Sequence, residues 1–350
     1  MRPRLLYLAL LCIGLTGLSA CSSNLLHRLD SPVLLQGNDS TAYRDPAVIY
    51  HRGTFYLYFT VSRITPDSIV NFVAQSESRD LLHWSAPRPV TPIAQHLGYS
   101  SPGNVVRYGD EWILCLQTYP RPDYRPEQGV RYGNDQARLF IMRSRDLQHW
   151  SEPELLPVKG DIPVEEMGRM IDPYLIEDRD EPGKWWCFYK QQGASMSYTY
   201  DFRHWTYFGR TNAGENVSLL TTDSGYIMFH SPQNGIAMKR SADMREWQDF
   251  GSLITLGQAK WNWARGRLTA GTVLDLRHVR RIGHYLMFFH GSGPLTESEG
   301  DFNRNASIGI AWSDDLVHWK YPGENSPLLK VHCSLFIVHC TLYIIHCPLF

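Results

Sequence analysis

The chain has 350 residues, of which 34 are Lys or Arg and 35 are Asp or Glu, so its formal net charge is -1. This balance excludes the basic surplus that a nucleic-acid partner needs, and it excludes a polyacidic disordered chain. With 27 Gly, 21 Pro and 13 % aromatic residues, the composition favours many short strands and tight turns over long helices.

The first twenty residues resemble a bacterial lipoprotein signal. Arg2 and Arg4 supply positive charge, an apolar run covers residues 5–18, and small residues precede Cys21. The alternative, a transmembrane anchor, is disfavoured because the run is short for a full span. We expect residues 1–20 to be removed, Cys21 to carry lipid and residues 21–29 to be a linker. This predicts a location in the bacterial cell envelope, at the outer membrane or its periplasmic face, with the lipid as the only membrane contact.

Residues 331–350 are three near-copies of one short segment, VHCSLFI, VHCTLYI and IHCPLF. Their His-Cys pairs offer metal ligands, but a zinc site mixes its ligands with turns, and no turn separates these copies. We interpret the tail as a low-complexity, non-functional repeat. In the body of the chain, Cys115 and Cys187 lie in apolar runs that predict two buried thiols, with a disulfide as the alternative.

The body, residues 30–330, repeats one turn five times. Each copy has an Asp, an apolar residue directly after it and a Trp four positions after the Asp; the copies lie at 80–84, 146–150, 201–205, 243–247 and 315–319. Aromatic strands are expected ahead of them at 54–61, 111–119, 184–190, 225–230 and 284–290. The Asp would cap the turn, while the apolar residue and the Trp wedge between neighbouring units. Five such units predict an all-β fold, a five-bladed β-propeller in one domain; a two-sheet sandwich would not need the same turn five times.

The first strand of each unit should line the central channel, so equivalent residues should ring one mouth of it. Aligned on each other, the units begin at Asp45, Gly103, Asp172, Glu215 and Gly271. Carboxylates that converge on a narrow opening repel one another, so one is expected to hold a proton while another stays ionised. Glycosidic hydrolysis requires such a pair. Taken singly, Asp45 or Asp172 would be a turn cap and Glu215 a solvated loop residue; their equivalence favours a site.

The motifs Tyr43-Arg44-Asp45-Pro46 and Ile171-Asp172-Pro173-Tyr174, together with the Trp-ended turns, resemble the family 43 glycoside hydrolases over most of residues 30–330. The resemblance implies a propeller that hydrolyses arabinose-, xylose- or galactose-containing glycans with inversion. It implies Asp45 as general base, Asp172 as the residue that modulates pKa and Glu215 as general acid. The stretches 230–235 and 261–271 depart from the family, as does Glu215-Asn216-Val217 in place of Glu-Gly-Pro. They indicate a divergent subgroup near family 117, in which a His can serve as the acid.

Seven further residues are candidates for substrate contacts: Arg44, Asn104, Arg169, His230, Trp263, Arg265 and Arg267. The arginines would hold carboxylates or an acidic sugar, whereas Trp263 would stack on a sugar or fill the core, and His230 would bind substrate or be structural. The resemblance adds His290 as a holder of a structural Ca²⁺ in the central channel, with no cofactor required.

We therefore expect a glycosidase that acts on non-reducing ends or short glycans, with an oligo- or polysaccharide as its partner. The alternatives are a non-catalytic glycan-binding propeller and a glycoside phosphorylase, for which Arg265 and Arg267 would be the phosphate site.

Overall fold

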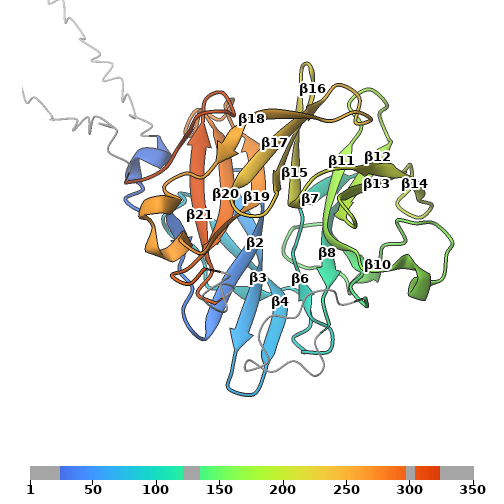
Figure 1. The fold of residues 1–350 in the computed structure, drawn as a ribbon, viewed down its shortest axis with the longest axis horizontal. Coiled ribbons are helices and arrows are strands. Elements are labelled where there is room, and N and C mark those ends of the chain that lie inside the picture. The colour runs from blue at the N-terminus through green and yellow to red at the C-terminus, as the bar shows by residue number, and fades with distance from the viewer. Residues whose placement is uncertain (1–23, 121–134, 297–303, 324–350) are drawn as a thin grey trace, which may run out of the picture.

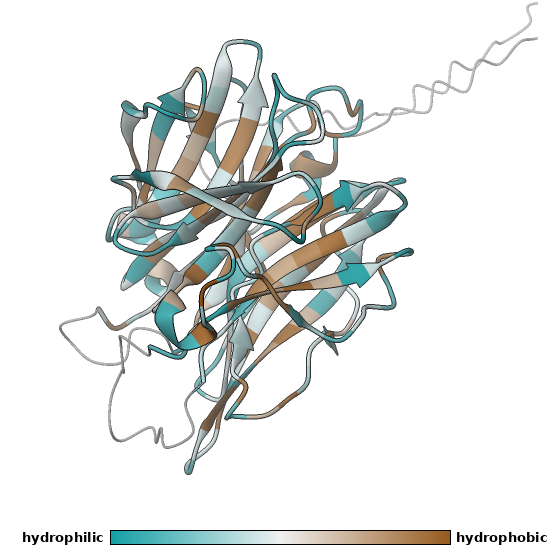
Figure 2. Ribbon diagram, turned by 90° about the vertical axis from the view of Figure 1, so that its right-hand side faces the viewer, coloured by the Kyte–Doolittle hydropathy of each residue, from teal (hydrophilic) through white to brown (hydrophobic). Residues whose placement is uncertain are grey.

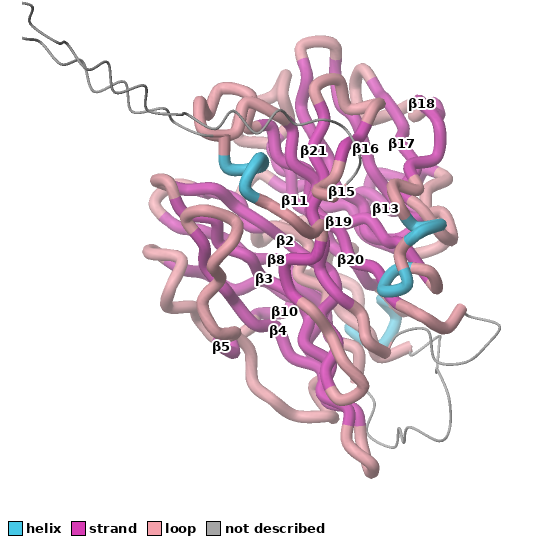
Figure 3. Tube along the Cα trace, turned by 90° about the vertical axis from the view of Figure 1, so that its left-hand side faces the viewer, coloured by secondary structure: helices cyan, strands magenta, loops and turns pink. Residues whose placement is uncertain are grey.

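The computed structural model describes residues 24–120, 135–296 and 304–323. These residues form five antiparallel sheets, and their only helical segments are short 3-10 turns (Figures 1 and 3). The signal region, Cys21 and the His-Cys repeats lie outside the described residues. No helix in the described ranges is both long and apolar enough to cross a bilayer.

The five sheets are the blades of a β-propeller, which confirms the predicted all-β fold. The strands of blade 1 are β2 (Thr41–His51), β3 (Thr54–Ile64), β4 (Ile69–Ser78) and β5 (Arg88–Pro89). Those of blade 2 are β6 (Tyr99–Ser100), β7 (Val105–Tyr108), β8 (Glu111–Thr118), β9 (Leu139–Ser144) and β10 (Glu154–Leu155). Those of blade 3 are β11 (Ile171–Glu177), β12 (Trp185–Lys190), β13 (Ala194–Thr199) and β14 (Thr206–Thr211). Those of blade 4 are β15 (Glu215–Thr222), β16 (Gly225–Ser231), β17 (Ile236–Ser241) and β18 (Gln248–Ile254).

Blade 5 joins the two ends of the described chain. Its strands β19 (Arg267–Asp275), β20 (Tyr285–Ser292) and β21 (Ser307–Ser313) come from the C-terminal part, and β22 (Trp319–Lys320) pairs with β21. β1 (Val33–Leu35), from the N-terminal part, also pairs with β21. Blade 5 therefore closes the ring, because hydrogen bonds in one sheet tie the first described strand to the last.

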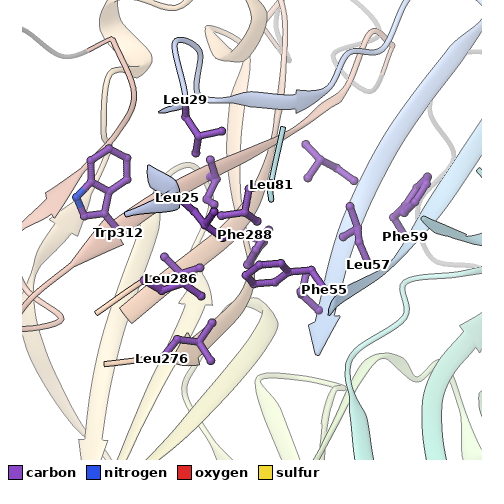
Figure 4. Packing of buried hydrophobic residues seen from close by; sticks show 14 of the residues in the cluster. Leu25, Leu29, Phe55, Leu57, Phe59, Leu81, Leu276, Leu286, Phe288 and Trp312 are labelled. Carbon is purple, nitrogen blue, oxygen red and sulfur yellow. The ribbon is translucent and has the colours of Figure 1, made fainter. Parts of the chain in front are cut away.

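The predicted linker at residues 21–29 is wrong where the structure describes it. The 3-10 turn η1 (Leu25–Arg28) packs against blades 1 and 5, and Leu25, Leu26 and Leu29 are buried there (Figure 4). The backbone N–H of Leu25 also donates a hydrogen bond to the carbonyl of Arg281 at 2.9 Å. Residues 24–29 therefore belong to the propeller, because their apolar side chains are part of its core.

The repeated turns cap themselves and wedge between blades, as predicted. In blade 1 the Asp80 Oδ1 atom accepts hydrogen bonds from the backbone N–H groups of Leu82 and His83, at 3.0 and 2.9 Å. The apolar residue after each Asp is buried and has a left-handed backbone, with φ between 59° and 68°; these residues are Leu81, Leu147, Phe202, Met244 and Leu316. Each lies in a different hydrophobic cluster, shared with the preceding blade, and Figure 4 shows Leu81 beside Phe288 of blade 5.

The core is divided among these inter-blade clusters rather than gathered in one place. Along the strands, apolar segments occupy the middle and polar residues the turns (Figure 2). Two side chains of the cluster between blades 2 and 3 are Cys115 and Cys187, which are buried and unpaired, so the prediction of free thiols is confirmed. Burial raises the pKa of the Cys115 thiol to about 12, which keeps it protonated and unreactive.

The wedge at blade 1 can be tested with two adjacent leucines. Leu81 is 1 % exposed and Leu82 is 37 % exposed. Leu81→Ala should lower the free energy of unfolding by about 2–5 kcal/mol, because it opens a cavity between blades 1 and 5. Leu82→Ala in the same turn should change it by about 0.5 kcal/mol or less. Urea unfolding of both variants measures this, and equal losses would contradict the wedge.

Candidate active site

A β-bulge interrupts the innermost strand of each blade beside the channel, and the pairing around it shows which residues are equivalent. The register with the second strand shifts between Arg44 and Ala47 in blade 1 and between Ile171 and Tyr174 in blade 3. It shifts after Glu215 in blade 4 and after Thr269 in blade 5. In blade 2 the break follows Ser100, the last residue of β6. The first residue of the interruption is therefore, in blade order, Asp45, Ser101, Asp172, Asn216 and Ala270.

This register corrects the alignment predicted from the sequence. Asp45 and Asp172 are equivalent, as expected, but Glu215 lies one position earlier, where blade 1 has Arg44. Gly103 and Gly271 are also not the equivalents of Asp45. The true counterpart in blade 2 is Ser101, and the sequence carried a signal for it, because a proline follows Ser101 just as one follows Asp45 and Asp172.

Each bulge frees a backbone N–H from its sheet, and at four junctions a side chain of the preceding blade accepts it. In each case the accepting atom belongs to the second-strand residue that pairs with the last residue before the bulge. The pairs are Thr60 Oγ1 with Ser101 N–H (2.7 Å), Gln117 Oε1 with Asp172 N–H (2.6 Å), Ser231 Oγ with Ala270 N–H (2.7 Å) and His290 Nδ1 with Asp45 N–H (3.2 Å). A buried N–H without a partner is costly, so these bonds hold neighbouring blades in register at the channel.

The bulge residues surround one narrow pocket. It is lined by Asp45, Pro46, Ser101, Pro102, Gly103, Asp172, Pro173, Asn216, Val217 and Gly271, and its open space, with the mouth included, is about 260 Å³. All five blades contribute to this lining. We call it the channel pocket. Four of its residues, Asp45, Ser101, Asp172 and Asn216, have left-handed backbones with φ between 42° and 53°. Such non-glycine conformations carry strain and are concentrated at functional sites.

Asp45 is held as a buried carboxylate. The hydroxyls of Thr60 and Ser101 donate to its Oδ2 atom at 2.8 and 3.2 Å, and the Asn216 amide donates to its Oδ1 atom at 3.4 Å. Burial alone would raise the pKa of Asp45, but the charge of Arg44 and these hydroxyls outweigh it, so the pKa lies below its usual value. His290 adds no charge at neutral pH, because burial lowers its pKa to about 3 and its Nδ1 atom is an acceptor.

Asp172 is the carboxyl that keeps a proton. Burial, together with the negative charges of Glu215 and Asp45, raises its pKa to about 7. A hydrogen bond from Ser101 and the positive charge of Arg169 oppose that rise. Because the three acids interact, the proton belongs to the group rather than to one side chain. The site therefore holds an ionised carboxylate and a protonated one near neutral pH.

Glu215 stands at the exposed edge of the group. Its side chain is 37 % exposed, and Arg267 Nη2 donates to its Oε2 atom at 3.2 Å. Arg44, Arg169 and Arg267 thus each accompany one of the three acids, as the sequence suggested. Each acid is repelled by its neighbours, and the positive charges of the arginines offset this repulsion. Three carboxyls can therefore share a small space.

Four other predicted residues lie elsewhere or serve the fold. Asn104 is buried. Its Nδ2 atom donates to the carbonyl of Leu175 at 2.7 Å, and its Oδ1 atom accepts the Leu175 N–H at 2.9 Å. Asn104 therefore bridges blades 2 and 3 and is not part of the candidate site. Trp263 stacks on Trp261 and Phe289 in the core of blades 4 and 5. Arg265 is exposed and donates to the carbonyl of Pro294. His230 lines a second cleft, described below.

The donor set does not favour a cation at His290. Its Nδ1 atom already accepts the Asp45 N–H, and Ca²⁺ requires six to eight oxygen ligands. The described residues contain no group of three or more His, Cys, Asp or Glu placed to hold a metal ion. We therefore assign no step to a metal.

Several solved structures that share this arrangement of blades are described as glycoside hydrolases. A glycosyl hydrolase from Bacteroides ovatus matches with a TM-score of 0.56 and 12 % identity, over 84 % of this chain and 90 % of that one. An exo-1,5-alpha-L-arabinanase from a bovine ruminal metagenomic library matches at 0.52 and 16 %, over 82 % and 99 %. A family 117 glycoside hydrolase from Zobellia galactanivorans matches at 0.54 and 15 %, over 78 % and 85 %. No family model matches the chain, and no curated protein does. A GH43 beta 1,3 galactosidase matches at 0.54 and 12 %, over 84 % and 98 %. At these identities the likeness shows the fold, and it confirms the predicted likeness of that fold to the propellers of families 43 and 117.

The proton on Asp172 should appear in the pH dependence of stability. Its pKa is 3.8 in the unfolded chain and about 7 in the folded one, so the folded chain binds more protons between these values. Wild-type stability should therefore fall as pH rises from about 4 to 7. Asp172→Asn removes this loss and should be more stable than wild type at pH 7, by on the order of 2 kcal/mol, with the difference vanishing near pH 4.

Thermal unfolding from pH 4 to 8 measures this difference. Asp39→Asn, at an exposed position, is the matched control and should follow wild type at every pH. If Asp172→Asn also followed wild type, Asp172 would not be a buried acid that interacts with other acids.

Proposed function

We propose that the chain is a glycosidase that hydrolyses O-glycosyl bonds with inversion, at non-reducing ends or in short glycans of arabinose-, xylose- or galactose-type sugars. The observation that carries the proposal is the channel pocket, where an ionised Asp45 lies close to a carboxyl, Asp172, that holds a proton near neutral pH. Hydrolysis of an acetal needs a base and a proton donor at the same time, and a group of three interacting acids, Asp45, Asp172 and Glu215, can supply both. The glycoside hydrolases among the matching structures support the same chemistry.

Asp45 is the general base in this mechanism. Thr60 and Ser101 occupy its Oδ2 atom, so Oδ1 is the oxygen that takes a proton from the attacking water. Asn216 donates to Oδ1 over a long 3.4 Å contact, which water can replace. The water then attacks the anomeric carbon from the face opposite the leaving group, which produces inversion.

Glu215 is the general acid in this mechanism. Glu215 is the most exposed of the three acids and can reach the leaving oxygen of a sugar seated over the pocket. Asp172 is buried in the wall of the channel pocket, so we assign it the role of adjusting the pKa values of its neighbours through its charge, not contact with the leaving group. Arg267 holds the Glu215 carboxylate after the proton has left.

We also propose that the enzyme works at the bacterial cell envelope, held by lipid on Cys21. The signal-like residues 1–20 and the cysteine that follows them support this location.

Asp45→Asn and Glu215→Gln should each lower kcat by about 10²- to 10⁴-fold on an aryl glycoside panel of arabinosides, xylosides and galactosides, because each removes one proton-transfer group. Glu246→Gln, in an exposed turn of blade 4, is the matched control and should keep full activity. Proton NMR of the first product should show the inverted anomer.

Full activity in both site variants would refute the assignment of the acid and base, and a retained anomer would refute inversion. Turnover that requires phosphate would make the enzyme a phosphorylase. Glycan binding without any turnover would make the chain a binding module.

A further inference from the structure

The junction between blades 3 and 4 differs from the other four at the channel. There Lys190 pairs with Ile171 beside the bulge. It occupies the position that Thr60, Gln117, Ser231 and His290 hold in the other blades. An ammonium group has no lone pair, so it cannot accept the N–H of the next bulge. Its Nζ atom instead donates to the carbonyl of Ala213 over a long 3.5 Å. This junction therefore lacks the closing bond, and a basic side chain stands in its place.

A cleft lies at this junction, much larger than the channel pocket. It is lined by Lys190, Asn212, Ala213, Gly214, His230, Pro232, Ala237, Met238, Lys239, Asp249, Gly251, Ser252 and Leu253, and its open space, with the mouth included, is about 1020 Å³. We call it the blade-4 cleft. Its size suits one or two sugar rings, whereas the channel pocket is narrow.

His230 is built into the wall of this cleft. The ring is buried, and its Nδ1 atom accepts the backbone N–H of Gly214 at 3.0 Å. In the neutral ring the proton is then on Nε2, which has no hydrogen-bond partner among the described residues. Burial lowers the pKa of His230 to about 4, so the ring is neutral at physiological pH. His230 therefore supplies the wall of the cleft with one N–H donor in a fixed position, its Nε2–H.

Two lysines add positive charge beside this donor. Lys239 is buried, and its Nζ atom lies 2.6 Å from Asp249 Oδ1. Asp249 is 89 % exposed at the rim, so water screens its charge. Within the described ranges, Lys190 has only the weak contact with Ala213. The charged groups of the lining are therefore two ammoniums and one carboxylate, which leaves a surplus of positive charge around the N–H of His230.

The cleft and the channel pocket are neighbours along the chain. Gly214 lines the cleft, Asn216 lines the channel pocket, and Glu215 stands between them. Because only Glu215 separates the two linings along the chain, the next sugar of a glycan whose reacting sugar lies over Asp45 and Glu215 can reach the cleft. The contacts in the cleft then select among substrates.

We propose that the blade-4 cleft binds an anionic substituent of the glycan, the carboxylate of a uronic acid or a sulfate ester, through Lys190, Lys239 and the Nε2–H of His230. This inference rests on the proposed function and adds a substrate class to it: acidic rather than neutral glycans. Charge-assisted hydrogen bonds from ammonium groups are the interactions that recognise such anions.

The test follows the imidazole signals of His230 by NMR while simple sugars are added. The probes are galacturonic acid, galactose 6-sulfate, neutral galactose and inorganic sulfate, and His230→Asn assigns the signals. The two acidic sugars, or one of them, should shift the signals saturably, and neutral galactose should not. Lys190→Met should weaken that binding about tenfold, the loss of one charge-assisted contact. Lys320→Met, at the outer edge of blade 5, is the matched control and should leave it unchanged.

The galacturonate and sulfate arms show which anion the cleft takes. Equal shifts with neutral galactose, or no shift with either acidic sugar, would overturn the proposal. So would unchanged binding in Lys190→Met. If inorganic sulfate binds as tightly as the sugar acids, the cleft binds anions without recognising the sugar, and the proposed selection of acidic glycans is overturned. Because this readout needs no catalysis, it can fail while the glycosidase assignment stands, and the reverse also holds.

Discussion

Four hydrogen bonds that cross from blade to blade position the acids of the channel pocket. Four of the five bulges turn one N–H out of their sheet to an acceptor of the preceding blade, which is Thr60, Gln117, Ser231 or His290. The same bulges carry strained, left-handed residues at Asp45 and Asp172. The strain is tolerated because the surrounding blades fix each N–H, and the consequence is that residues far apart in sequence line one pocket.

The electrostatics of the site follow from that enclosure. Asp45 receives hydroxyl donors and the charge of Arg44, so it stays ionised, whereas Asp172 is enclosed near two other acids and keeps a proton. Two carboxyls at equivalent positions of two blades thus take opposite roles through their surroundings alone. The exception to the closing bonds, at Lys190, coincides with the blade-4 cleft, which is larger than the channel pocket.

Much of this fold could be predicted from the sequence, because the turn with Asp, an apolar residue and Trp repeats and buries its apolar residue between blades. The roles of single residues were less accessible. Glu215 was placed one position off because blade 4 lacks the proline that follows the first bulge residue in blades 1, 2 and 3. Ser101 was missed because its hydroxyl lacks the charge that drew attention to Asp45. Asn104 looked like a sugar ligand until its bonds to Leu175 showed a bridge between blades.

Carbon-13 NMR of the aspartate side-chain carboxyls, with Asp172 assigned from Asp172→Asn, tests most directly whether these acids share one buried pocket. The Asp172 signal should titrate with a midpoint near pH 7, while the Asp45 signal should stay that of a carboxylate from pH 5 to 8. If both carboxyls titrated near pH 4, like free aspartates, the acids would lie apart in water and the site would not exist as described.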